Sequence, residues 1–122
     1  MKVEFPRITG RVTGDAVSSI LSLTMNPNQL TIVVFIQAKQ STKQQVREEL
    51  TQLAAKTRTE AGNINYDLHV SNADDSLFII HENWKDQAAL DSHMNEPYLK
   101  SFLGKTDELL AAPVDGTICT KL

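Results

Sequence analysis

Two stretches of alternating apolar and polar residues place the strongest constraint on the fold of this chain. The first, NINYDLHV, spans residues 63–70, and the second, SLFIIHENW, spans residues 76–84. Alternation with a period of two is typical of a β-strand that has one face on a core. The polar segment SNADD joins the two stretches and supplies turn residues. The sequence therefore predicts a β-hairpin.

The side chains of this hairpin also predict its register. Apolar side chains that lie opposite one another on neighbouring strands stabilise a sheet. Placing Leu68 opposite Ile80 keeps the apolar residues of the two strands together. The same register sets Tyr66 opposite Glu82, and Asp67 opposite His81.

Patterns outside the hairpin predict two further strands and three helices. The β-branched run LTIVVFIQAK, residues 30–39, has the length of a strand, and VDGTICTKL, residues 114–122, forms a last strand. Helices are expected at residues 41–62, 86–94 and 97–110. Ser41 begins the first helix with a capping box, and Asp86 caps the second. The order β-α-β-β-α-α-β predicts an α+β, ferredoxin-like fold with an antiparallel sheet.

The predicted sheet carries apolar side chains on both faces. Helices of this topology cover one face, where we expect the inward hairpin residues together with Val33 and Phe35. The opposite face would then carry Ile32, Val34, Ile36, Leu77 and Ile79. Leaving these five exposed would forgo on the order of 10 kcal/mol of burial. We therefore expect a second copy to pack on this face and to form a dimeric α/β barrel.

Length and charge limit the classes of protein that are possible. A chain of 122 residues has room for one domain, which we place at residues 30–122, after an N-terminal arm at residues 1–29 that lacks sustained periodicity. The net charge of −3 offers no basic stripe for nucleic acid. No apolar run is long enough for a membrane helix, and Cys119 is the single cysteine. We expect a cytoplasmic protein.

Histidines and cysteine do not predict a metal centre or a nucleophile. The alternation places His69 and His81 on the dimer face, whereas His93 shares the apolar side of its helix. The three histidines therefore cannot converge within one subunit, and neither a ligand spacing nor a fourth ligand for a metal is evident. No histidine is placed in the sequence so as to indicate a catalytic pair with Cys119, and no serine lies in a nucleophile elbow.

Glu82 is the residue that most needs an explanation. It lies on a sheet face otherwise occupied by Phe78, Ile80 and Trp84, where an unpaired carboxylate costs several kcal/mol. One interpretation is a pocket in which Glu82, His93 and Tyr66 interact beside Trp84. The other is that the aromatic residues are core and that Glu82 anchors a loop or a helix end.

Residues 62–102 resemble the antibiotic biosynthesis monooxygenase domain, and in particular its quinol monooxygenase branch. The resemblance is carried by Gly62, Tyr66 and Leu68, then Phe78, the Glu82-x-Trp84 triplet, Leu90 and His93, and an aromatic residue in the next helix. It extends over about Leu30 to Leu122 and implies a dimeric α+β barrel. It also implies a monooxygenase without metal, flavin or haem, in which the reduced aromatic substrate itself donates electrons to dioxygen.

On this resemblance, we expect His93 to be the acid/base, Glu82 its orienting group or an alternative base, and Tyr66 a donor to the developing oxyanion. Trp84, Phe78 and Phe35 would bind the substrate, an aromatic quinol. One alternative is a branch of the same family that isomerises a small phosphorylated signalling metabolite. The other is a dimeric binding module without catalytic activity.

Overall fold

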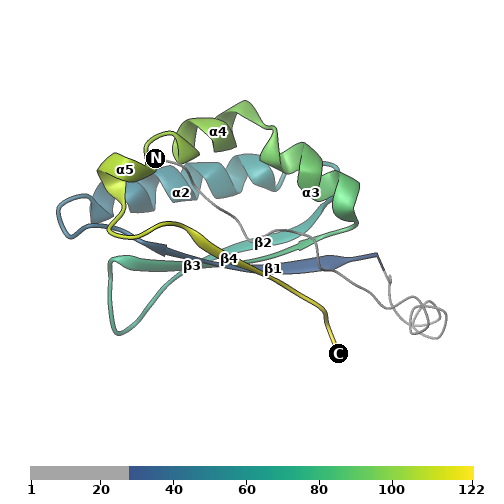
Figure 1. Ribbon diagram of the computed structural model, residues 1–122, viewed down its shortest axis with the longest axis horizontal. Coiled ribbons are helices and arrows are strands. Elements are labelled where there is room, and N and C mark those ends of the chain that lie inside the picture. The colour runs from purple at the N-terminus through teal and green to yellow at the C-terminus, as the bar shows by residue number, and fades with distance from the viewer. Residues whose placement is uncertain (1–27) are drawn as a thin grey trace.

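A single sheet with helices on one face forms the described part of the protein (Figure 1). The computed structural model describes residues 28–122, so nearly all of the predicted arm lies outside the described residues. The strands are β1 (Leu30–Gln37), β2 (Asn63–Val70), β3 (Leu77–Trp84) and β4 (Asp115–Cys119). The helices are α2 (Lys43–Thr57), α3 (Gln87–Met94), α4 (Pro97–Leu103) and α5 (Thr106–Leu109). This order confirms the predicted ferredoxin-like fold.

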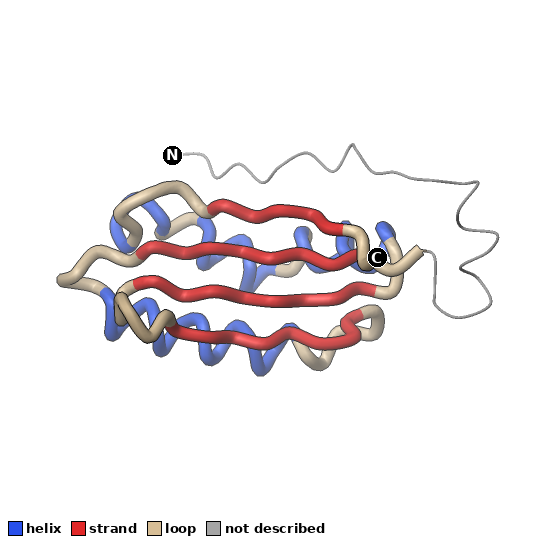
Figure 2. The backbone as a smooth tube through the Cα atoms, turned by 90° about the horizontal axis from the view of Figure 1, so that it is seen from below, coloured by secondary structure: helices blue, strands red, loops and turns tan. Residues whose placement is uncertain are grey.

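The sheet is antiparallel and open, with the strand order β2-β3-β1-β4 (Figure 2). Leu68 pairs with Ile80, Tyr66 with Glu82 and Asp67 with His81. The predicted register of the hairpin is therefore confirmed. Strict alternation in both strands specifies it, because a slip by one residue would turn every side chain to the wrong face.

The predicted orientation of β1 is wrong. Ile32, Val34 and Ile36 are buried beneath the helices, whereas Phe35 is 39% exposed on the opposite face. The β1–β3 register explains this, because it sets Ile32 opposite the inward-facing Glu82. Residues 32–36 are apolar at every position, so the sequence of β1 contains no alternation that could distinguish its two faces.

This correction also changes the composition of the open face of the sheet. Of the five apolar residues expected there, Leu77 and Ile79 remain, and Val33 and Phe35 join them. Phe35 lies directly opposite Ile79 in the sheet. Figure 2 shows that the described helices leave this face uncovered.

The helices follow the predicted apolar stripes, with differences at their ends. Helix α2 buries Val46, Leu50, Leu53, Ala54 and Thr57, as its spacing predicts. Its N-cap is Thr42 rather than Ser41, and it makes no side-chain capping bond. The last predicted helix is divided at Gly104 into α4 and α5. No helix among the described residues is long and apolar enough to cross a membrane.

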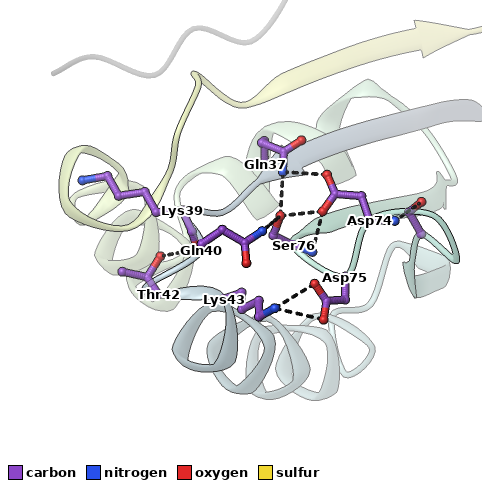
Figure 3. Close-up of polar contacts among 9 residues, drawn as sticks. Gln37, Lys39, Gln40, Thr42, Lys43, Asp74, Asp75 and Ser76 are labelled. Atoms are coloured by element: carbon purple, nitrogen blue, oxygen red, sulfur yellow. Dashed lines mark hydrogen bonds and ion pairs between the residues drawn. The ribbon is translucent and has the colours of Figure 1, made fainter.

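A polar network closes one end of the sheet (Figure 3). Ser76 is buried, and its backbone N–H and hydroxyl both donate to Asp74 Oδ1, at 3.0 and 2.6 Å. Gln37 Nε2 donates to the second carboxylate oxygen of Asp74 and to Ser76 Oγ. The network joins the β2–β3 turn to the end of β1, so it stabilises the end of the sheet away from Trp84.

Candidate active site

An apolar cavity lies between the sheet and the helices. The cavity has a volume of about 70 Å³. Its polar lining consists of Tyr66, Glu82 and His93, the three residues predicted to be catalytic. The remaining lining is Gly116 and apolar side chains, namely Ile32, Val34, Ile36, Leu53, Ile80, Leu90, Met94, Leu99, Phe102, Leu103, Val114 and Ile118. The structure therefore brings the three polar residues together on one cavity.

The position of α3 determines where His93 lies. Asp86 caps the helix as predicted, because its Oδ1 accepts the backbone N–H of Ala89 at 2.8 Å. A Cβ atom at Gly62 would lie only 2.2 Å from Ala89 Cβ, so the absence of a side chain at Gly62 allows α3 to approach the start of β2. His93 follows on the last turn of α3, 3% exposed and facing the cavity.

Glu82 is a buried carboxyl group with one described hydrogen-bond partner. Trp84 Nε1 donates to Glu82 Oε1 at 2.6 Å, and Glu82 is 4% exposed. Burial raises the pKa of Glu82 to about 7, the Trp84 bond opposes this rise, and the charge of Glu60 adds to it. At neutral pH both protonation states of Glu82 are populated, so it can donate or accept a proton.

The partner of His93 differs from the predicted one. His93 Nδ1 lies 2.8 Å from Glu60 Oε2, and no hydrogen bond joins His93 to Glu82 among the described residues. Sequence reasoning missed Glu60. The residue lies in the irregular segment between α2 and β2, 33 positions before His93, and no motif or periodicity marks it.

Tyr66 brings a buried hydroxyl to the cavity. It is 3% exposed, and its hydroxyl has no hydrogen-bond partner among residues 28–122. Burial raises the pKa of Tyr66 well above its ordinary value, and the charges of Glu82 and Glu60 raise it further. The hydroxyl therefore keeps its proton and is available as a donor to a ligand.

The three residues predicted to bind substrate do not line the cavity. Trp84 is fully buried beside the cavity. The centroid of its ring lies 4.6 Å from that of His93, and its N–H donates a hydrogen bond to Glu82. Phe78 is 1% exposed within the core. Phe35 lies on the opposite face of the sheet, because the pairing of β1 with β3 turns Ile32 and Val34 toward the helices. This position corrects the predicted orientation of β1.

The histidines are distributed as the alternation predicts. His69 and His81 pair with Ile79 and Asp67 across the β2–β3 ladder, on the face away from the cavity that His93 lines. Within residues 28–122, no three His, Cys, Asp or Glu side chains are placed to hold one metal ion. At the cavity itself, the imidazole of His93, the carboxyl group of Glu82 and the phenol of Tyr66 can transfer protons and form hydrogen bonds.

Fold and cavity together define a class of small α+β proteins in which buried acid/base groups line an apolar cavity. The sequence pattern of the antibiotic biosynthesis monooxygenase family matches residues 29–105 of this chain. The chain therefore belongs to the antibiotic biosynthesis monooxygenase family.

Individual proteins are similar to this chain in sequence or in fold. A Bacillus subtilis (strain 168) protein with the provisional name monooxygenase YcnE is 31% identical over 86 residues, which cover 70% of this chain and 90% of that protein. The crystal structure of PA3566 from Pseudomonas aeruginosa is 33% identical, with a TM-score of 0.75 over 80% of this chain and 98% of that chain. Rv0793 from Mycobacterium tuberculosis has a TM-score of 0.73 at 24% identity, over 77% and 95% of the two chains.

Proposed function

We propose that this protein is a cofactor-independent monooxygenase that oxidises a quinol or a related reduced aromatic molecule with dioxygen. The observation that carries the proposal is the cavity, in which Tyr66, Glu82 and His93 are the polar groups within an otherwise apolar lining. An apolar ring with phenolic oxygens suits such a lining, because its oxygens find partners while its carbon atoms leave water. Membership of the monooxygenase family supports the same reaction class.

In the proposed reaction, His93 removes a phenolic proton from the bound hydroquinone. Because Nδ1 of His93 is hydrogen-bonded to Glu60, Nε2 is the ring nitrogen that can accept the proton of the substrate. The phenolate donates electrons to dioxygen, and a bond forms between a ring carbon and oxygen. Tyr66 donates a hydrogen bond to the oxyanion, and Glu82 is a second proton donor or acceptor.

The atoms and electrons balance without a further reductant. Cleavage of the O–O bond leaves one oxygen atom on the ring and releases the other as water. The ring loses four electrons in becoming a hydroxyquinone, and these electrons reduce both oxygen atoms. The water takes up two protons of the hydroquinone. The apolar lining excludes bulk water from the reactive intermediate.

An oxygen electrode tests this proposal directly. Protein shown by elemental analysis to be free of metal should consume oxygen with 1,4-naphthohydroquinone faster than buffer does. In labelled dioxygen, one ¹⁸O atom should enter the product. His93→Ala should lower the catalysed rate about a hundredfold or more, as loss of a general base does. Glu48→Ala is the control, since Glu48 is exposed on α2, away from the cavity and from the open face of the sheet. A wild-type rate equal to autoxidation would refute the proposal.

The alternative functions receive less support. Isomerisation of a phosphorylated metabolite needs a cation for the phosphate, and neither Arg nor Lys lines the cavity. A binding module without catalytic activity gains support if His93 is packed on all sides, but His93 opens onto a cavity.

We also propose that the protein is a homodimer formed through the open face of the sheet. Phe35 and Ile79 lie opposite each other there, with Val33 and Leu77 on either side along the strands. Phe35 is 39% exposed in the isolated chain, which is unusual for a large aromatic side chain on a regular strand. A second copy would cover this apolar strip with an identical one.

A further inference from the structure

Glu60 connects the buried imidazole to the outside of the molecule. Its Oε2 atom is 2.8 Å from His93 Nδ1 and also accepts the hydroxyl of Tyr98. The side chain of His93 is 4% exposed and that of Glu60 is 9% exposed. Two side chains from different helices therefore converge on one almost buried carboxylate oxygen.

Glu60 lies behind His93 as seen from the cavity. It does not line the cavity, and it lines instead a surface hollow with Gly62, Lys85 and Ser92. A ligand in the cavity would thus touch His93 and not Glu60. Any effect of Glu60 on a reaction there has to act through His93.

The contacts of Glu60 and Trp84 restrict the imidazole of His93. A carboxylate on Nδ1 favours the tautomer that has the proton on Nδ1 and leaves Nε2 as an acceptor. The ring of Trp84 lies 4.6 Å from that of His93 at an interplanar angle of 33°, so it limits rotation of the imidazole. The negative charge of Glu60 also stabilises the imidazolium that forms when Nε2 takes up a proton.

Tyr98 holds Glu60 in this position. Burial, followed by the hydrogen bond to Glu60, raises the pKa of the Tyr98 hydroxyl above its ordinary value, so the hydroxyl stays protonated and remains a donor. The Tyr98 ring in turn lies 5.7 Å below the ammonium group of Lys56, on the last turn of α2. Helices α2 and α4 therefore both support the carboxylate.

We propose that Glu60, held by Tyr98, is the positioning residue that sets the tautomer of His93 and stabilises its protonated form. The expected effect of Glu60 on turnover rests on the proposed function. The effect on the tautomer does not depend on turnover.

Kinetics with 1,4-naphthohydroquinone test the effect on turnover. Glu60→Gln keeps the size of the side chain and removes its charge, and should lower kcat about ten- to a hundredfold while KM stays within about twofold. Tyr98→Phe should lower kcat by a smaller factor, about two- to tenfold. Glu48→Gln is the matched control, since Glu48 is exposed on α2. A wild-type kcat in Glu60→Gln, or a change confined to KM, would overturn the proposal.

Nuclear magnetic resonance tests the tautomer without any substrate. Long-range ¹H–¹⁵N correlation spectra of histidine-labelled protein should show His93 with the proton on Nδ1. Glu60→Gln should lose this preference, because an amide can both donate to and accept from Nδ1. A wild-type proton on Nε2, or unchanged His93 signals in Glu60→Gln, would overturn the proposal. A wild type that consumes no oxygen but shows these tautomers would refute the proposed function and support the role of Glu60.

Discussion

Replacing Glu82 by Gln should make the protein more stable at alkaline pH. Gln has nearly the shape of Glu and can still accept the N–H of Trp84 through its amide oxygen. The substitution removes the negative charge that burial disfavours. It therefore isolates the energetic effect of ionising a carboxyl group that is 4% exposed.

The pKa of Glu82 gives the sign and size of the effect. The pKa is 4.5 in the unfolded chain and about 7 in the folded protein. Below pH 4.5 both states are protonated, so Glu82 adds no pH-dependent term. Between pH 4.5 and 7 the folded state holds more protons, and stability falls as the pH rises. Above pH 7 the loss is complete, at about 3 kcal/mol for a group this deeply buried.

Urea denaturation of both proteins at pH 5 and pH 8.5 measures this effect. The free energy of unfolding of Glu82→Gln, minus that of wild type, should be about 2.5 kcal/mol larger at pH 8.5 than at pH 5, because part of the loss has already occurred at pH 5. Taking the difference cancels other titrating groups and any constant effect of the amide. Glu48→Gln, an exposed control, should show no such change. A difference independent of pH would refute the reasoning, because Glu82 would then ionise equally well in both states.

Three further substitutions test the packing of the site and of the sheet. Gly62→Ala should lower the free energy of unfolding by about 1–3 kcal/mol, measured in urea, because its Cβ would lie 2.2 Å from Ala89 Cβ. Trp84→Phe should also lower the free energy of unfolding by about 1–3 kcal/mol, because it removes the N–H that donates to Glu82. This decrease should be smaller at pH 5, where Glu82 is protonated in the folded protein. Phe35→Glu should convert the proposed dimer to a monomer in light scattering at micromolar concentration. A wild-type monomer would contradict the dimer.

Prediction from the sequence succeeded where one residue pattern has one structural solution. The hairpin register follows from alternation in both strands, and the cap of α3 follows from Asp86 before an apolar stripe. It failed where the pattern is ambiguous. The apolar run of β1 is compatible with either face, and only its pairing with β3 orients it, so Phe35 was misplaced.

Local periodicity and pairing between adjacent strands were enough to predict the fold from the sequence, and the residue pattern around Glu82-x-Trp84 indicated the family. The convergence of Tyr66, Glu82 and His93 on one cavity was one of two interpretations that the sequence left open. The hydrogen-bond partners of these residues became known only from the packing of the helices on the sheet. The carboxylate on His93 belongs to Glu60, and Trp84 supports Glu82 rather than lining the cavity. Such contacts depend on how α3 and α4 pack against the end of α2. Helix packing sums many weak contacts between segments far apart in the sequence, and no short motif encodes it.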